Sequence, residues 1–139
     1  MPKASILQFS NYSVQQLLFE DIPLSSTQRE FRLHPHFNME LLDKGNDRYD
    51  VKLSVEIMST EECPVPFRLY VALTGHFVYN DDNNEIPMEI KEQLLRKNTV
   101  AILFPFLRQI VATLTTTANI PPLMLPIMNF DNGQVDSEN

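Results

Sequence analysis

Residues 67–79 of this 139-residue chain read FRLYVALTGHFVY. Aromatic or aliphatic side chains stand at every second position from Phe67 to Tyr79, with Gly75 as the exception on that register. Successive side chains of a β-strand point to opposite faces, so this alternation places the apolar side chains together on one face. The stretch therefore predicts a strand about 40 Å long, and Gly75 predicts a bend or bulge within it.

Shorter alternating runs lie upstream of this stretch. Residues 51–57 alternate in the same way and follow the turn signal KGND at residues 44–47. Residues 31–41 alternate too, but Pro35 has no N–H to donate, so we expect this strand at a sheet edge or starting after Pro35. The short, proline-rich segment 61–66 suits a connection between antiparallel neighbours. These runs predict a meander, and residues 5–14 are expected to form a further strand.

A change of period follows the polar turn of residues 80–85. Residues 88–97 predict a short helix, and a longer helix is expected from about Asn98 to Thr116 or Thr117. Pro105 falls inside it, and a proline in a helix interior removes a hydrogen bond and clashes with the preceding turn. We therefore expect either a kink at Pro105 or a regular helix that starts near Phe104.

The longer helix is apolar on two sides. A helix that is apolar over so much of its circumference requires burial on two sides, whereas a single small sheet covers one. We therefore expect a homo-oligomer, a dimer or a tetramer, in which the second side meets another subunit. The interface residues predicted on this basis are Ile102, Phe104, Leu107, Val111 and Leu114.

Composition and charge exclude several classes of function. Eleven Lys and Arg against 18 Asp and Glu give a net charge of -7, which disfavours nucleic acids and anionic membranes as partners. The three glycines leave no glycine-rich phosphate loop. Cys63, the single cysteine, excludes an intramolecular disulfide and suits a reducing cytoplasm. The dense apolar run of residues 100–107 is far shorter than the roughly 18 residues of a membrane span, and no secretory signal is evident.

No catalytic or metal-binding constellation is predicted. His34 and His36 would share one face of a strand, but two ligands are too few for a metal site. His76 is interpreted as a half-buried sheet residue instead of a general base, and Cys63 has no nearby basic residue to activate it. We therefore expect no metal and no cofactor, and a binding protein in preference to an enzyme. An enzyme or small-ligand binder stays the third alternative.

An apolar arm interrupted by prolines follows the helix. Residues 119–130 read NIPPLMLPIMNF and suit neither a helix nor a central strand. Methionine and aromatic side chains adapt to irregular apolar partners. For any single residue a place in the core or in a subunit interface is the stronger interpretation, but together these residues favour a binding surface. The polar tail from residue 132 is expected to fray.

The helix start and the arm carry specific motifs. Residues 102–108 read ILFPFLR, residues 121–125 fit P-x-L-x-L, and residues 129–131 close with NFD. This combination resembles SecB, the cytosolic export chaperone, whose family shares an I-L-F-P-[YF]-x-R helix start, P-x-L-x-L and N-F-D. Weaker matches at residues 34–41, 49–55 and 74–77 extend the resemblance over nearly the whole chain.

The resemblance implies one α+β domain over residues 1–139. It implies a four-stranded antiparallel sheet with a crossover connection, followed by a long C-terminal helix, and a dimer of dimers with helices at the interface. It also implies an ATP-independent holdase that binds unfolded or nascent polypeptides in apolar grooves. On this chain the grooves would include parts of residues 26–37 and 120–128. The candidate client-binding residues are Leu33, Phe37, Ile120, Leu123, Leu125 and Met128.

The chain also departs from the family pattern at positions linked to the SecA motor. Family members carry a second helix and a tail after N-F-D, whereas eight residues follow Asp131 here. Arg68, Tyr70 and Gln15 stand where a leucine, a glutamate and an aspartate would lie, which puts engagement of SecA in doubt. Two hypotheses stay open: a holdase that could deliver preproteins for export, and a SecB-fold scaffold with one dedicated partner, such as a toxin-antitoxin chaperone, without an export role.

Overall fold

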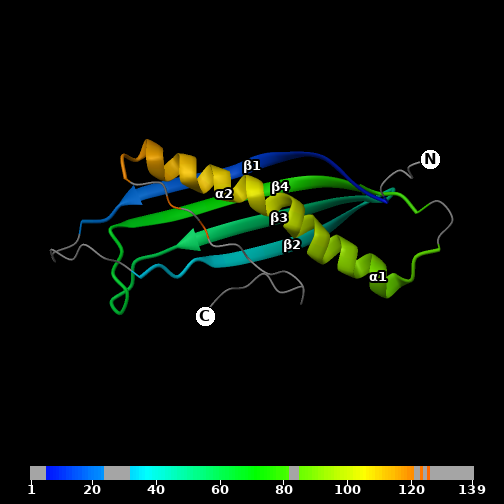
Figure 1. The fold of residues 1–139 in the computed structure, drawn as a ribbon, viewed down its shortest axis with the longest axis horizontal. Coiled ribbons are helices and arrows are strands. Elements are labelled where there is room, and N and C mark those ends of the chain that lie inside the picture. The colour runs from blue at the N-terminus through cyan, green and yellow to red at the C-terminus, as the bar shows by residue number, and fades with distance from the viewer. Residues whose placement is uncertain (1–5, 24–31, 82–84, 121–122, 124, 126–139) are drawn as a thin grey trace.

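One antiparallel sheet and one helical run make up the fold (Figure 1). The structure, a computed structural model, describes residues 6–23, 32–81, 85–120, 123 and 125. Four strands pair in the order β1-β4-β3-β2, so the connection from β1 to β2 crosses from one sheet edge to the other. This confirms the expected α+β fold. The elements are β1 (Leu7–Asp21), β2 (His36–Gly45), β3 (Arg48–Ile57), β4 (Phe67–Tyr79), α1 (Met88–Gln93), the π-helical turn η1 (Leu94–Asn98) and α2 (Thr99–Thr117).

The strands follow the alternation of the sequence closely. β4 covers the whole of the stretch 67–79 and lies inside the sheet between β1 and β3. β2 begins at His36, directly after Pro35, and forms a sheet edge. Pro35, which has no N–H to donate, therefore lies outside the strand. Asn46 and Asp47 between β2 and β3 both have positive φ, 55° and 60°, which is typical of the tight turns that match the twist of a hairpin.

The expected bulge at Gly75 is wrong. The pairing of β4 with β3 runs through Gly75 without a shift, and the irregularities of the sheet lie in β1, between Phe9 and Asn11 and between Val14 and Gln16. A Cβ atom on Gly75 would lie 2.5 Å from Cδ2 of Leu103 on α2. The glycine therefore allows the helix to approach the sheet closely.

The helix passes through Pro105 without interruption. α2 is continuous from Thr99 to Thr117, so its regular part begins before Phe104, and the irregular turn η1 lies upstream of the proline. Pro105 and Ala101, whose carbonyl loses its donor, are both exposed. Water can therefore replace the missing hydrogen bond, which explains why the proline is tolerated.

The core lies between the sheet and α2. α1, η1 and α2 cross one face of the sheet diagonally (Figure 1), and the inward side chains of β3, β4 and α2 form one buried cluster. By length and composition the helical segment Met88–Thr117 is long and apolar enough to cross a membrane, which the short run of residues 100–107 did not predict. Its packing against the sheet is that of a core helix. The completely buried side chains include Leu53, Leu69, Val71, Leu73, Leu103, Leu107 and Val111.

Candidate functional site

The described candidate client-binding residues belong to the apolar core beneath α2. Phe37 at the start of β2 packs against Phe104 of α2, with ring centroids 5.7 Å apart and an interplanar angle of 55°. Leu33, Ile120 and Leu123 pack against the same core cluster. Segments that are far apart in the sequence, before β2 and after α2, therefore share one apolar core.

Hydrogen bonds with α2 also hold the arm at Leu123 and Leu125. Nε of Arg108 donates to the carbonyl oxygen of Leu125 at 3.0 Å. The N–H of Leu123 donates to Oγ1 of Thr115 at 2.9 Å, and that hydroxyl donates to the Val111 carbonyl at 3.0 Å. Positions 108 and 115 are about two turns apart, so both attachment points lie on one side of the helix.

The candidate client-binding side chains differ in accessibility. Phe37 is 5% exposed and Leu125 is 1% exposed, so both are core residues of the single chain. Leu33, Ile120 and Leu123 are half-buried, and Met128 and residues 26–31 lie outside the described residues. A polypeptide can therefore contact Phe37 or Leu125 only after neighbouring parts of the chain move.

The candidate interface residues divide in the same way. Phe104, Leu107 and Val111 are buried within the chain, and Ile102 and Leu114 are half-buried. One sheet thus covers more of α2 than the apolar pattern indicated. Of the five predicted interface residues, only Ile102 and Leu114 are thus not buried within the chain.

An exposed apolar strip borders α2 on strand β1. Val14 and Leu17 are 43% and 53% exposed. They pair with Leu73 and Val71, whose side chains belong to the core, so they lie on the helix-bearing face of the sheet. Because β1 is an edge strand, this strip has neither a neighbouring strand nor a full cover on that side.

The opposite face of the sheet, which we call the outer face, is polar. Arg68 contacts Glu56 through Nη2 at 3.2 Å and Glu20 through Nη1 at 3.5 Å. The hydrogen bond to Glu56 raises the pKa of the Arg68 guanidinium. Arg68 thus partly neutralises two carboxylates, at the part of the chain where the family pattern predicts a leucine.

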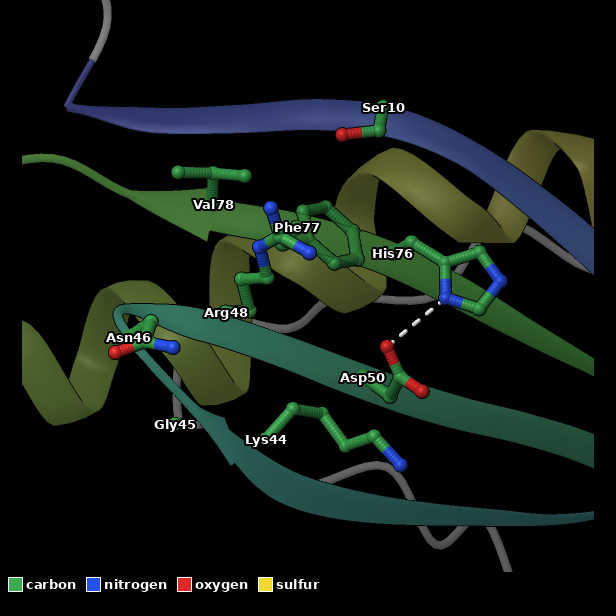
Figure 2. Close-up of a pocket in the computed structure, with 9 residues that line it drawn as sticks. All are labelled: Ser10, Lys44, Gly45, Asn46, Arg48, Asp50, His76, Phe77 and Val78. Carbon is green, nitrogen blue, oxygen red and sulfur yellow. Dashed lines mark hydrogen bonds and ion pairs between the residues drawn. The ribbon is translucent and has the colours of Figure 1, made fainter.

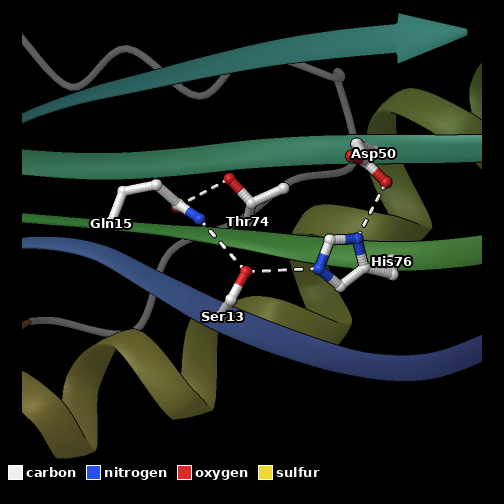
Figure 3. Close-up of polar contacts among 5 residues, drawn as sticks. All are labelled: Ser13, Gln15, Asp50, Thr74 and His76. Carbon is white, nitrogen blue, oxygen red and sulfur yellow. Dashed lines mark hydrogen bonds and ion pairs between the residues drawn. The ribbon is translucent and has the colours of Figure 1, made fainter. Parts of the chain in front are cut away.

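A chain of side-chain hydrogen bonds crosses the outer face (Figure 3). Nδ1 of His76 lies 2.9 Å from Oδ1 of Asp50, and Nε2 lies 3.2 Å from Oγ of Ser13. Nε2 of Gln15 donates to Ser13 at 3.1 Å, and Oγ1 of Thr74 donates to Gln15 at 2.7 Å. The sequence predicts His76 as half-buried, and its side chain is 36% exposed. The partners were missed because they lie 26 and 63 residues away and meet His76 through strand pairing.

A depression of about 650 Å³ adjoins this chain at the hairpin between β2 and β3 (Figure 2). Asp50 and His76 form one side of it, and Lys44 and Arg48 bring two positive charges. No group of three or more His, Cys, Asp or Glu that could hold a metal ion occurs among the described residues.

Two tyrosines hold α1 against the end of the sheet. Nζ of Lys91 lies 4.8 Å from the ring centroid of Tyr79 and 5.6 Å from that of Tyr49. Its hydrogen bond with Tyr49 raises the pKa of Lys91. Burial raises the pKa of Tyr79, whose hydroxyl is buried and has no hydrogen-bond partner among the described residues.

Known proteins resemble this chain in sequence and in fold. The profile of a family described as SecB, preprotein translocase subunit SecB, matches residues 3–133. Protein-export protein SecB of Zymomonas mobilis is 29% identical over 134 residues, which cover 94% of this chain and 77% of that protein. An uncharacterized protein of Methanocaldococcus jannaschii is 29% identical over 131 residues, with 92% and 82% covered.

A further relative and a solved structure are also similar to this chain. Protein-export protein SecB of Anaplasma phagocytophilum is 35% identical over 82 residues, so the match covers 59% of this chain and 51%, about half, of that relative. Among solved structures, the SecB-like chaperone of Mycobacterium tuberculosis in complex with a ChAD peptide from the HigA1 antitoxin has a TM-score of 0.70 at 14% identity, with 88% of this chain and 90% of that chain covered.

Proposed function

This chain belongs to the SecB family, and from that premise we propose that it is a cytoplasmic, ATP-independent holdase that binds unfolded polypeptides. The single observation that carries the proposal is the apolar core at the start of β2, α2 and the arm, whose outer members Leu33, Ile120 and Leu123 are half-buried. Half-buried apolar side chains next to a weakly attached segment can bind apolar segments of many sequences.

Binding requires the arm to move. Two hydrogen bonds of about 0.5–1.5 kcal/mol each and the burial of one leucine, about 1.5–3 kcal/mol, oppose its release. Displacing Leu123 and Leu125 therefore costs about 2.5–6 kcal/mol on these figures. A client that buries its own apolar side chains against Phe37 and Phe104 offsets this cost, and a client without such side chains does not. We infer that apolar, non-native segments are selected in this way.

Suppression of aggregation of a slow-folding client tests this proposal. The wild-type protein should suppress light scattering of the client when present in stoichiometric amounts. Leu123→Glu should weaken suppression at least several-fold while the fold survives, because the side chain is half-buried and the charge can reach water. Gln93→Glu on exposed α1 adds the same charge away from the arm and should leave suppression unchanged. No suppression by the wild-type protein would contradict the holdase function.

A scaffold for one dedicated partner is the second candidate. The similarity in fold to a chaperone solved with an antitoxin peptide and the pairing of Arg68 with Glu20 and Glu56 on the outer face favour it. Affinity capture from the native host should then return one dominant protein instead of many. Binding to purified SecA, measured with and without client, separates an export role from both alternatives.

We also propose that the protein is a homo-oligomer, a dimer or a tetramer. The exposed Val14 and Leu17 of β1 lie on the helix-bearing face of the sheet, and Ile102 and Leu114 of α2 are half-buried. A second copy of the chain that covers β1 would bury this strip and the free edge of the sheet.

A further inference from the structure

Three adjacent strands place a serine, a histidine and a carboxylate in hydrogen-bonding sequence (Figure 3). Ser13 comes from β1, His76 from β4 and Asp50 from β3, and β4 lies between the other two strands. The Ser13 Oγ to His76 Nε2 distance is 3.2 Å, and the His76 Nδ1 to Asp50 Oδ1 distance is 2.9 Å. A nucleophile, a base and a group that orients the base are thus within reach of one another.

The donors and acceptors along this chain fix the direction of each hydrogen bond. An ionised carboxylate can only accept, so Asp50 favours the His76 tautomer that carries its proton on Nδ1. Nε2 is then free to accept the Ser13 hydroxyl proton. Thr74 donates to Gln15 and Gln15 donates to Ser13, so all hydrogen bonds point toward Asp50. Aligned hydrogen bonds polarise one another, which strengthens the bond from the Ser13 hydroxyl to Nε2 of His76.

Ser13 is also accessible. It is exposed on an edge strand and lies between the two register shifts of β1, and such irregularities commonly re-aim side chains next to reactive sites. The depression of about 650 Å³ is lined by His76 and Asp50 and not by Ser13 (Figure 2), so a reagent reaches Ser13 from the open side of the edge strand. This site lies on the opposite face of the sheet from α2, so it is independent of the proposed polypeptide binding.

We propose that Ser13 is a nucleophile activated by His76 and Asp50, and that it becomes acylated by activated acyl donors such as esters. Ser13 Oγ attacks the carbonyl carbon of the donor RCO–X while its proton moves to Nε2 of His76. The tetrahedral intermediate then breaks its C–X bond, and the leaving group departs with the proton from Nε2. The products are acyl-Ser13 and HX, and no oxidant or cofactor takes part.

The reaction should be slow and stoichiometric. Efficient acyl transfer uses preorganised donors aimed at the carbonyl oxygen of the acyl donor, each worth about 100- to 1000-fold in rate, whereas the Gln15 amide donates to Ser13 Oγ itself. General-base assistance by His76 is expected to contribute about 100- to 10,000-fold. That contribution is the measurable signature of the site.

Acetylation by p-nitrophenyl acetate, with the modified residue located by peptide mass spectrometry, tests the proposal on the full chain. We expect one acetyl group on Ser13, about 100-fold slower acetylation of Ser13 in His76→Gln, and no acetyl-Ser13 peptide in Ser13→Ala. The control Thr113→Ala, which removes an exposed hydroxyl on α2 on the other face of the sheet, should react like the wild type. Asp50→Asn should slow the reaction and Asp50→Glu should restore part of it, because Asp50 acts by positioning His76.

Two results would overturn the proposal. One is a wild-type protein in which Ser13 stays unmodified while surface lysines are acetylated. The other is acetylation of Ser13 at the same rate in His76→Gln and Asp50→Asn as in the wild type. Circular dichroism of each variant shows whether the fold is retained. If His76→Gln or Asp50→Asn unfolds, the acetylation rate of the variant that stays folded tests the proposal.

Discussion

At the scale of single residues, Gly75 determines how closely α2 lies on the sheet. A Cβ atom there would meet Leu103 at 2.5 Å and Phe77 at 2.8 Å. Gly75→Ala should therefore lower the free energy of unfolding by about 1–3 kcal/mol, measured by urea denaturation. Leu103→Ala removes the Leu103 atoms from this contact and leaves Phe77, so the double variant should lose less than the sum of the single variants. Additive losses would show that the close approach has no energetic consequence.

The buried hydroxyl of Tyr79 gives a prediction for alkaline pH. The raised pKa values of Tyr79 and Lys91 mean that the folded chain holds both protons more tightly than the unfolded chain. Their stabilisation is therefore present below about pH 10 and lost as the pH rises through the folded-state values. Tyr79→Phe should keep or slightly raise stability at pH 7, because it removes a buried hydroxyl without a described partner.

Urea midpoints measured between about pH 7 and pH 11 check this prediction. The loss of stability above about pH 10 should be smaller in Tyr79→Phe than in the wild type. A variant that is clearly less stable at pH 7, or that loses stability more steeply in alkali, would contradict it.

Residue-scale prediction from the sequence has a definite limit in this chain. The resemblance to SecB placed Phe37 and Leu125 among the candidate binding residues, as it did Leu33 and Leu123. Phe37 and Leu125 are core residues, whereas Leu33 and Leu123 are half-buried. Phe104 packs against Phe37, and Arg108 donates a hydrogen bond to the Leu125 carbonyl. Neither contact leaves a periodic signal in the sequence. The partners of His76 escaped notice for the same reason.

At the scale of elements, the attachment of the arm to α2 is testable. Thr115→Val removes the acceptor of the Leu123 N–H, so hydrogen exchange of the Leu123 amide should become about 2- to 10-fold faster. Thr116→Val is the matched control, because its hydroxyl bonds to the Ala112 carbonyl within the helix. Equal exchange rates in both variants would show that Thr115 does not hold the arm.

The elements themselves were largely predictable. Period-two alternation identified β2, β3 and β4, because each of these strands has one face on the core and one polar face. The continuity of α2 through Pro105 and the π-helical turn at Leu94–Asn98 were not predictable. The continuity of α2 depends on whether water can replace the backbone hydrogen bond lost at Pro105, which depends on tertiary exposure.

At the scale of the whole molecule, the proposed oligomer rests on the exposed strip on β1. Light scattering at micromolar concentration should give a mass of two or four chains of 16.1 kDa. Leu17→Glu should separate the subunits without unfolding them, because the side chain is 53% exposed in one chain. Val111→Glu should instead unfold the chain, since a charge at this completely buried position has no partner. A wild-type mass near 16 kDa would contradict the oligomer.

The central claim is that the chain binds polypeptides in their unfolded state, and fluorescence anisotropy tests it most directly. A labelled, permanently unfolded polypeptide is titrated with the wild-type protein, and the folded form of the same polypeptide serves as the comparison. We predict saturable binding of the unfolded form without ATP, weakened by Leu123→Glu and unaffected by Gln93→Glu. An equal rise in anisotropy for the unfolded and folded forms, or no rise with either form, would contradict the account.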